Sequence, residues 1–373
     1  MIRINYITNL DVDNYSGGWS GMNYNIYQQL SGKFHIHLLQ KIDPPYILSE
    51  KIFSKAFRNA GMKGIFPAFT KRRLKQIKMQ VESEIDNSCQ LNFYHGVTPW
   101  LLVENKLPYA VYLDCCFWSY INVYHNSQQF SSRQLKNLFN KEADFLNNAK
   151  YVFFSSKWAL QDAKTGYHLK GNNLFVAGLG GALTSHAAKT HINNPYFLFV
   201  GLDFYGKGGD KVVDAFEIVR KQNSEFKLKI VGQEPPAKYR SVANVEYAGI
   251  FDKSEAGDLR KLTELFTNAF CLVLPTTKDM TPLVIIEASA VGCPVIATNN
   301  FGIPEMIKHN ETGLLLDAKL QLTQQLAIAM EEMIKNKDLR QKFIMNSPGY
   351  VRTNFTWERT GKIIGDKIIE SLS

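Results

Sequence analysis

The sequence predicts an α/β protein of two doubly wound domains, each with a parallel β-sheet covered by helices on both faces. Twelve short apolar runs, typical of buried strands, alternate along the chain with amphipathic helical patterns. These runs fall into two series of six. A polar stretch without periodicity, Thr184–Pro195, separates the two series and indicates a linker between domains.

The apolar runs give the expected order of the elements. The first series predicts strands at Ile2–Ile7, His35–Leu39, Leu91–Tyr94, Tyr109–Leu113, Tyr151–Phe154 and Leu174–Ala177. The second predicts strands at Tyr196–Val200, Leu228–Val231, Val245–Tyr247, Phe270–Leu274, Val295–Ala297 and Gly313–Leu316, with helices at Asp210–Gln222, Leu259–Thr267 and Leu320–Ile334. Because ligands of doubly wound sheets bind beyond the carboxyl ends of the strands, we expect the site in a cleft shared by two domains that face each other.

Composition limits the class of protein. The chain has 373 residues, 45% hydrophobic and 21% charged, which is the balance of a soluble globular protein with two domains. A net charge of +9 favours an anionic partner: nucleic acid, a phosphate-bearing substrate or an anionic membrane. The five cysteines match neither a zinc site nor a disulfide framework, and the first residues read as a strand rather than a signal peptide, so we expect a reduced, cytoplasmic protein.

The strongest motif is a strand, a polar loop and a helix that begins near Pro282. The free N–H groups at such a helix start form a ready anion site. Asp279 before the helix and Glu287 within it could hold hydroxyls of a sugar and of a ribose on either side of a diphosphate. The spacing is equally compatible with Asp279 as a helix cap and Glu287 as a structural acceptor, although a glutamate in an apolar helix needs a partner. The candidates here are Asp279, Thr281, Pro282, Leu283, Val284 and Glu287.

This segment resembles the signature of the family-four glycosyltransferases of the GT-B fold, in which seven residues separate two acidic ones. Asp279 stands where the family usually has glutamate, and Glu287 holds the second position. The family's two glycine–proline motifs appear as Gly292-Cys-Pro294 and Gly302-Ile-Pro-Glu305. The resemblance implies that Asp279 contacts the hydroxyls of the donor sugar and that Glu287 contacts the ribose of the nucleotide.

The resemblance also implies an architecture and an activity. We expect a Rossmann-like acceptor-side domain at 1–190, a Rossmann-like donor domain at 191–355, and a helix at 356–373 that crosses back to the first domain. The implied activity is that of a retaining glycosyltransferase (class EC 2.4) that uses a nucleotide-sugar donor. No cofactor or metal is expected, because amide dipoles and a lysine can stabilise the leaving diphosphate.

A second motif is a glycine-rich turn after a strand, Gly201-Leu-Asp-Phe-Tyr-Gly-Lys207-Gly208. Its glycines permit a close backbone approach and Lys207 supplies a point charge, although an ordinary turn with a solvated lysine has the same pattern. Lys207 matches the family's diphosphate-binding lysine. The family's arginine falls at Leu202 or, in a subgroup, at Gly206, so the second charge is missing here or supplied elsewhere.

The first domain offers weaker candidates. A glycine-rich loop precedes the predicted helix Met22–Leu30 and does not match the dinucleotide fingerprint. It reads either as a simple loop or, by resemblance, as a loop near the donor phosphate and the acceptor. Asp114 ends a strand and reads as a contact to the donor sugar or acceptor, or as a helix cap. A lone His95 is more often structural. The candidates are Gly17, Gly18, Ser20, Gly21 and Asp114, and Gly249, Ile250 and Phe251 in the second domain are expected to bind the base.

The segment Lys51–Lys78 holds nine lysines and arginines, no acidic residue and several phenylalanines. It reads either as a solvated basic face or as a peripheral contact with an anionic membrane at the inner face, where a lipid-linked acceptor would lie. No nucleic-acid-binding motif is present. The sequence thus predicts transfer from a UDP-sugar, with GDP-sugar as the alternative, to a glycan, lipid-linked or other hydroxyl acceptor of polysaccharide biosynthesis. A sugar-nucleotide epimerase of the same fold and a catalytically idle nucleotide-sugar-binding module are the alternatives.

Overall fold

The computed structural model describes residues 2–15, 19–183 and 195–372, which form two compact units. One unit comprises Met1–Gly178 with Trp357–Ser373, and the other comprises Leu179–Thr356. The predicted boundary at 190 lies outside the described residues, whereas the contacts begin the second unit at Leu179. The final helix, α14 (Trp357–Leu372), belongs to the first unit. No helix in the described ranges is long and apolar enough to cross a membrane.

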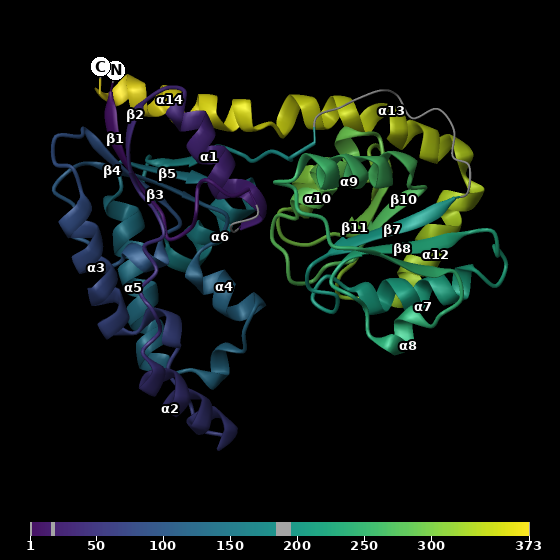
Figure 1. Cartoon of the computed structure of the whole chain (residues 1–373), viewed down its shortest axis with the longest axis horizontal. Coiled ribbons are helices and arrows are strands. Elements are labelled where there is room, and N and C mark those ends of the chain that lie inside the picture. Colours follow the sequence, from purple (N-terminus) through teal and green to yellow (C-terminus); the bar gives the residue numbers. More distant parts are fainter. Residues whose placement is uncertain (1, 16–18, 184–194, 373) are drawn as a thin grey trace. The chain divides into compact units, whose positions relative to one another are not determined.

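The first unit is built on a six-stranded parallel sheet in the order β2-β1-β3-β4-β5-β6. Helices flank both of its faces, and α14 lies beside α1 (Figure 1). The strands are β1 (Arg3–Ile7), β2 (His35–Leu39), β3 (Leu91–His95), β4 (Tyr109–Leu113), β5 (Tyr151–Phe154) and β6 (Leu174–Val176). The helices are α1 (Met22–Ser31), α2 (Leu48–Asn59), α3 (Lys71–Glu84), α4 (Phe117–Val123), α5 (Ser132–Asn148), α6 (Lys157–Tyr167) and α14.

The second unit has a six-stranded parallel sheet in the order β12-β11-β10-β7-β8-β9. Its strands are β7 (Tyr196–Gly201), β8 (Lys227–Gly232), β9 (Val245–Gly249), β10 (Cys271–Leu274), β11 (Val295–Thr298) and β12 (Leu314–Leu316). Its helices are α7 (Gly209–Val219), α8 (Ala237–Arg240), α9 (Ala256–Asn268), α10 (Leu283–Ala290), α11 (Ile303–Met306), α12 (Leu322–Lys335) and α13 (Lys337–Asn354). All twelve predicted strands are therefore confirmed, with each end within two residues of the prediction.

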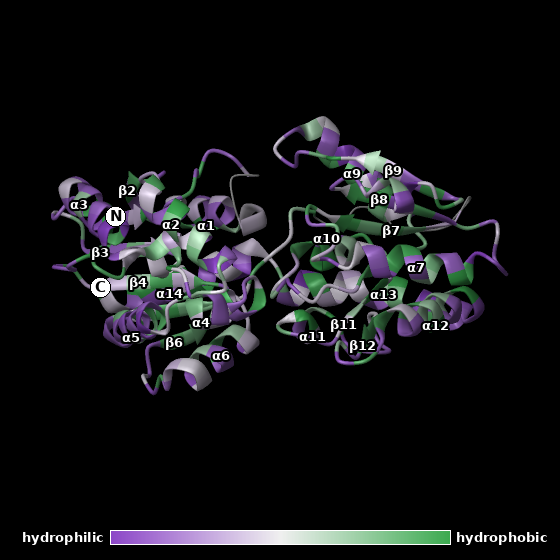
Figure 2. Ribbon diagram, turned by 90° about the horizontal axis from the view of Figure 1, so that it is seen from below, coloured by the Kyte–Doolittle hydropathy of each residue, from purple (hydrophilic) through white to green (hydrophobic). Residues whose placement is uncertain are grey.

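Burial explains why these segments form these elements. The strands of both sheets are mostly hydrophobic in Figure 2, and β3, β4, β10 and β11 are buried along their whole length. Helix α10 is apolar on every side, and all its residues except Val284 are buried. A helix of this kind lies inside the domain rather than on its surface. Glu287 on α10 is therefore carried into the interior of the second unit.

Candidate active site

The predicted anion site is the start of α10. Pro282 is the N-cap residue, with no side-chain cap, so the helix begins one residue after the proline rather than with it. The first turn bond is donated by the Ile285 N–H to the Pro282 carbonyl at 3.0 Å, and the N–H groups of Leu283 and Val284 precede it. Amides at a helix start, together with the positive end of the helix dipole, suit an anionic group such as a diphosphate.

Hydrogen bonds from other parts of the second unit hold the loop that leads into α10. The Gly302 N–H donates to the Met280 carbonyl at 3.0 Å, which places the predicted glycine–proline motif directly against this loop. The Thr298 hydroxyl at the end of β11 donates to the Thr276 carbonyl at 2.6 Å. Thr281 is buried within the same loop. The helix start is therefore rigidly placed, as a preorganised anion site requires.

Lys207 and Asp279 lie together beside this helix start. The Lys207 ammonium donates to Asp279 Oδ2, and both side chains are largely buried, with 23% and 18% of their surface exposed. Asp279 is thus an ion-pair partner and not the cap of α10. The turn requires glycine at Gly208, which has a φ of +81° and whose Cβ would lie 2.8 Å from the Pro275 carbonyl oxygen. Gly201 packs equally closely on the Lys207 stem.

Neither of the family's arginine positions carries a charge in this chain. Leu202 is 74% exposed. At Gly206 a Cβ would overlap the Asp203 carboxylate, which accepts the Gly206 N–H at 2.9 Å. A longer side chain at this position would require Asp203 to leave that bond. The β7–α7 loop therefore supplies Lys207 as its contribution of positive charge.

Glu287 has a basic partner that the sequence analysis missed. Its carboxylate is fully buried and accepts from Lys253 Nζ through both oxygens, at 2.6 and 2.7 Å. The Ala182 N–H also donates to Oε1 at 3.3 Å. Lys253 follows the predicted base-binding stretch by two residues, so a basic residue just beyond the carboxyl end of β9 was the signal available in the sequence.

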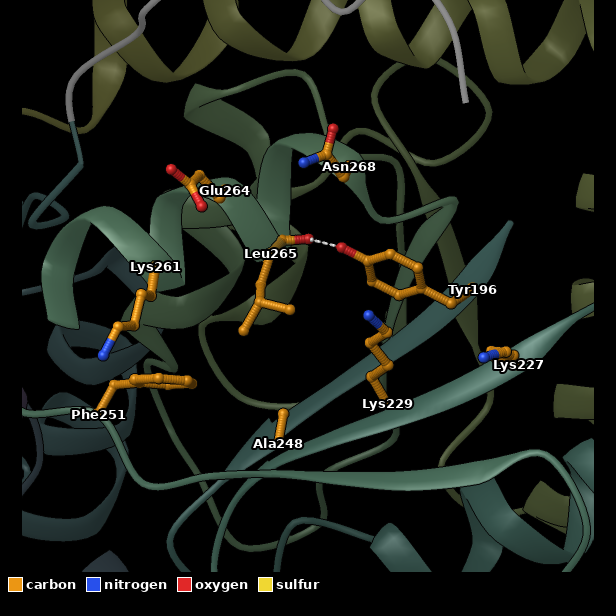
Figure 3. A pocket seen from close by; sticks show the side chains of 9 residues that line it. All are labelled: Tyr196, Lys227, Lys229, Ala248, Phe251, Lys261, Glu264, Leu265 and Asn268. Atoms are coloured by element: carbon orange, nitrogen blue, oxygen red, sulfur yellow. Dashed lines mark hydrogen bonds between the residues drawn. The ribbon is translucent and has the colours of Figure 1, made fainter. Parts of the chain in front are cut away.

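The segment expected to bind the base follows the edge strand β9. Gly249 ends that strand with a φ of +97°, and Ile250 is 63% exposed. Phe251 turns its ring toward Lys261, into a cavity of about 670 Å³ between α9 and the strands (Figure 3). The other lining residues are Tyr196, Lys227, Lys229, Ala248, Glu264, Leu265 and Asn268. Tyr196 and Lys227 open β7 and β8, so this cavity extends to the amino ends of the strands, away from the predicted donor site.

In the first unit, the glycine-rich loop is only partly described. Gly17 and Gly18 lie outside the described residues. Ser20 is exposed with a φ of +53°, and Gly21 is the N-cap residue of α1 with a φ of +89°. A Cβ on Gly21 would meet the Tyr15 ring at 2.5 Å, so this close approach needs glycine.

His95 is buried at the end of β3, between the rings of Trp19 and Tyr112. Within the described ranges neither of its ring nitrogens has a hydrogen-bond partner. Burial lowers the pKa of His95 to about 3, so the imidazole is neutral at physiological pH. A neutral, stacked ring agrees with the structural role that the sequence favoured.

Asp114 lies half-buried where β4 ends. The helix that follows, α4, has Cys116 as its N-cap residue with no side-chain cap, so the alternative of Asp114 as a helix cap is wrong. Desolvation and the neighbouring Asp114 carboxylate raise the pKa of the Cys115 thiol. This thiol is therefore poorly suited to act as a nucleophile.

A buried polar cluster holds the start of α4, directly after Asp114. Glu142 of α5 is fully buried and accepts from the Phe117 N–H at 3.0 Å and from the Thr98 hydroxyl at 3.3 Å. The Tyr167 hydroxyl accepts the next amide, from Trp118, at 3.0 Å. Burial raises the pKa of Glu142 to about 7, against the lowering effect of these hydrogen bonds.

The raised pKa of Glu142 predicts a pH-dependent contribution to stability. The folded state holds its proton more tightly than the unfolded state, so this contribution is complete below the unfolded pKa of 4.5 and is lost as the pH rises to about 7. Between pH 5 and pH 8 the wild type is expected to lose roughly 2 to 3 kcal/mol more free energy of unfolding than Glu142→Gln. Urea unfolding of both proteins at the two pH values measures this difference, and equal losses would contradict it.

Known proteins resemble this chain in sequence and in fold. Residues 184–349 match the family model described as glycosyl transferases group 1. The chain is 29% identical over 172 residues to a GDP-mannose-dependent alpha-(1-6)-phosphatidylinositol monomannoside mannosyltransferase of Mycobacterium tuberculosis, covering 43% of each chain. The chain spans less than half the length of this and other curated relatives that it matches.

Two solved structures resemble the whole chain in fold. Sucrose-phosphate synthase from Thermosynechococcus elongatus matches with a TM-score of 0.73 at 17% identity, over 100% of this chain and 99% of that one. Anabaena HepE, solved in complex with UDP and glucose, matches with a TM-score of 0.65 at 16% identity, over 99% of both chains. The chain therefore has the GT-B fold, and the sequence of its residues 184–349 is similar to the group 1 glycosyltransferases.

Proposed function

We propose that this protein transfers a sugar from a nucleotide-diphosphate-sugar to a hydroxyl acceptor with retention of configuration and without a metal ion. The observation that carries the proposal is helix α10, whose start has no side-chain cap. The Lys207–Asp279 and Lys253–Glu287 ion pairs have their acids just before this helix and within it. A diphosphate leaving group needs positive charge where its own charge develops. In this proposal the amides of Leu283 and Val284 and the Lys207 ammonium provide it.

In the proposed reaction the acceptor hydroxyl attacks the anomeric carbon on the face from which the diphosphate departs. The bond from that carbon to the diphosphate oxygen breaks, and the hydroxyl proton passes to the departing diphosphate. The protein's work is to position the two substrates and to stabilise charge. Asp279 holds hydroxyls of the donor sugar, Glu287 holds the ribose, and Asp114 contacts the donor sugar or the acceptor.

The donor is proposed to be a UDP-sugar, and a GDP-sugar is the alternative. HepE was solved with UDP and glucose, and the mycobacterial relative is named as GDP-mannose-dependent. The acceptor is proposed to be a glycan, a lipid-linked saccharide or another hydroxyl compound. The backbone of residues 249–251 is proposed to contact the base of the nucleotide.

Incubation with UDP-, GDP- and ADP-sugars, with and without EDTA, tests this function. Nucleotide release that needs an acceptor and persists in EDTA is the expected result, and the anomeric configuration of the product is read by NMR. Epimer formation without an acceptor would instead identify an epimerase. Nucleotide-sugar binding without turnover would identify an idle binding module.

We also propose that α2 rests on an anionic membrane surface. Four large apolar side chains of this helix are exposed: Leu48 (68%), Ile52 (56%), Phe53 (63%) and Phe57 (45%). At 100° per residue they lie on one half of the helix, and Lys51, Lys55 and Arg58 lie together beside them. An exposed apolar arc with cations along one edge suits an interface with anionic lipid, although Glu50 lies at its other edge.

Vesicle co-sedimentation tests the membrane contact. The wild type is expected to bind phosphatidylglycerol vesicles and to bind phosphatidylcholine vesicles weakly. Phe53→Ser with Phe57→Ser should weaken binding by roughly tenfold or more, because two aromatic side chains no longer enter the lipid. The control is Ile328→Ser with Met345→Ser, which removes two apolar side chains of similar exposure, 67% and 71%, from the second unit. Equal losses in both pairs, or no wild-type binding, would contradict the proposal.

A further inference from the structure

Glu287 is a buried carboxylate whose acceptor capacity is largely taken. None of its surface is exposed. A carboxylate offers about four acceptor positions, two on each oxygen. Oε1 accepts from Lys253 and from the Ala182 N–H, and Oε2 accepts from Lys253. These three bonds leave about one position, on Oε2, for a further donor such as a sugar hydroxyl.

The charge of Glu287 depends on few groups. Within the described residues, Lys253 is the charged side chain in contact with it, and the Lys207–Asp279 pair lies at the amino end of the same helix. Gly181 also packs closely on Glu287, since a Cβ on it would lie 3.1 Å from Glu287 Cγ. A buried carboxylate without a cationic partner takes up a proton instead of remaining charged. Lys253 is therefore the cationic partner that this buried carboxylate requires.

We infer that Lys253 is a positioning residue for the ribose of the nucleotide: it fixes the plane of the Glu287 carboxylate, so that Oε2 can accept a ribose hydroxyl. This inference rests on the proposed function, in which Glu287 binds the ribose. Two hydrogen bonds from one ammonium to both carboxylate oxygens restrain the rotation of the group. Lys253 acts through Glu287 and needs no contact of its own with the reacting atoms.

The inference makes ribose recognition depend on Lys253. Calorimetry would compare the affinity for UDP with the affinity for 2′,3′-dideoxy-UDP, which lacks both ribose hydroxyls. The same comparison would be made between GDP and 2′,3′-dideoxy-GDP. The wild type is expected to prefer the ribose form by roughly 10- to 100-fold, the range for a hydrogen bond to a charged group. In Lys253→Met this preference should fall toward one, because the carboxylate loses the two hydrogen bonds that hold its plane.

Two variants separate this role from a general loss of structure. Lys253→Arg keeps the charge and should keep the wild-type preference. Lys253→Met combined with Glu287→Gln leaves no unpaired buried charge, so it should fold, and its preference should be near one. Inorganic pyrophosphate, which has no ribose, should compete equally well in all variants, because the α10 amides and Lys207 are unchanged.

The possible outcomes distinguish a failure of this inference from a failure of the proposed function. If the wild type binds neither UDP nor GDP, the proposed function fails, and this inference fails with it. If the wild type prefers the ribose form and Lys253→Met shows the same preference, Lys253 has no such role, and the proposed function stands. A fall in pyrophosphate affinity that matches the fall in UDP affinity also overturns the inference, since the defect would then not concern the ribose.

Discussion

Replacement of Lys207 by alanine is expected to lower kcat/KM for the donor by roughly 100- to 1000-fold, the range for removal of one group that stabilises developing negative charge. Two effects combine. The leaving diphosphate loses the ammonium beside the α10 amides, and Asp279, with only 18% of its side chain exposed, loses its ion-pair partner. Steady-state kinetics with saturating acceptor measures the change.

A double-mutant cycle separates these two effects. If the activity of Lys207→Ala is lost mainly because Asp279 is unpaired, adding Asp279→Asn should restore activity. If the ammonium itself is needed, the double variant should remain as inactive as Lys207→Ala. Lys211→Ala is the matched control, since Lys211 pairs with Asp210 on the nearby helix α7 and is more exposed. If Lys207→Ala has a kcat/KM within threefold of the wild type and an unchanged circular dichroism spectrum, the diphosphate does not bind at this lysine.

Replacement of Glu287 by glutamine is expected to lower kcat/KM by roughly 100-fold, mainly through a higher KM for the donor. The ribose lies away from the bond that breaks. Loss of the contact to the ribose therefore weakens binding of the ground state and of the transition state alike. Glutamine keeps the shape of the side chain, but it has no charge and presents only one acceptor oxygen to Lys253 and the Ala182 N–H.

Glu246→Gln is the control for this substitution, because Glu246 makes an exposed pair with Lys227 in the same unit. Such surface pairs contribute little, so its kinetics should match those of the wild type. Calorimetry with UDP or GDP should show the binding loss directly for Glu287→Gln. Near-normal activity in both Glu287→Gln and Lys207→Ala would mean that the catalytic site is not at α10.

Local signals explain which parts of the site could be predicted. The start of α10 was visible because a proline and an apolar helix follow a buried strand, and such patterns involve neighbouring residues only. The helix-cap alternatives for Asp279 and Asp114 could not be decided in this way. Both residues stand two or three positions before the N-cap residue of a helix, and only the backbone path shows that Pro282 and Cys116 are the caps.

The sequence by itself determined the two series of strands, the helices between them and the loops that carry charge, because hydrophobic periodicity is a local property of the chain. Only the tertiary structure decided which charges meet. Lys207 and Asp279 are separated by 72 positions, and Lys253 and Glu287 by 34. An ion pair depends on the distance between two side-chain atoms, and that distance is set by the order of β7, β9 and β10 in the folded sheet rather than by spacing along the chain.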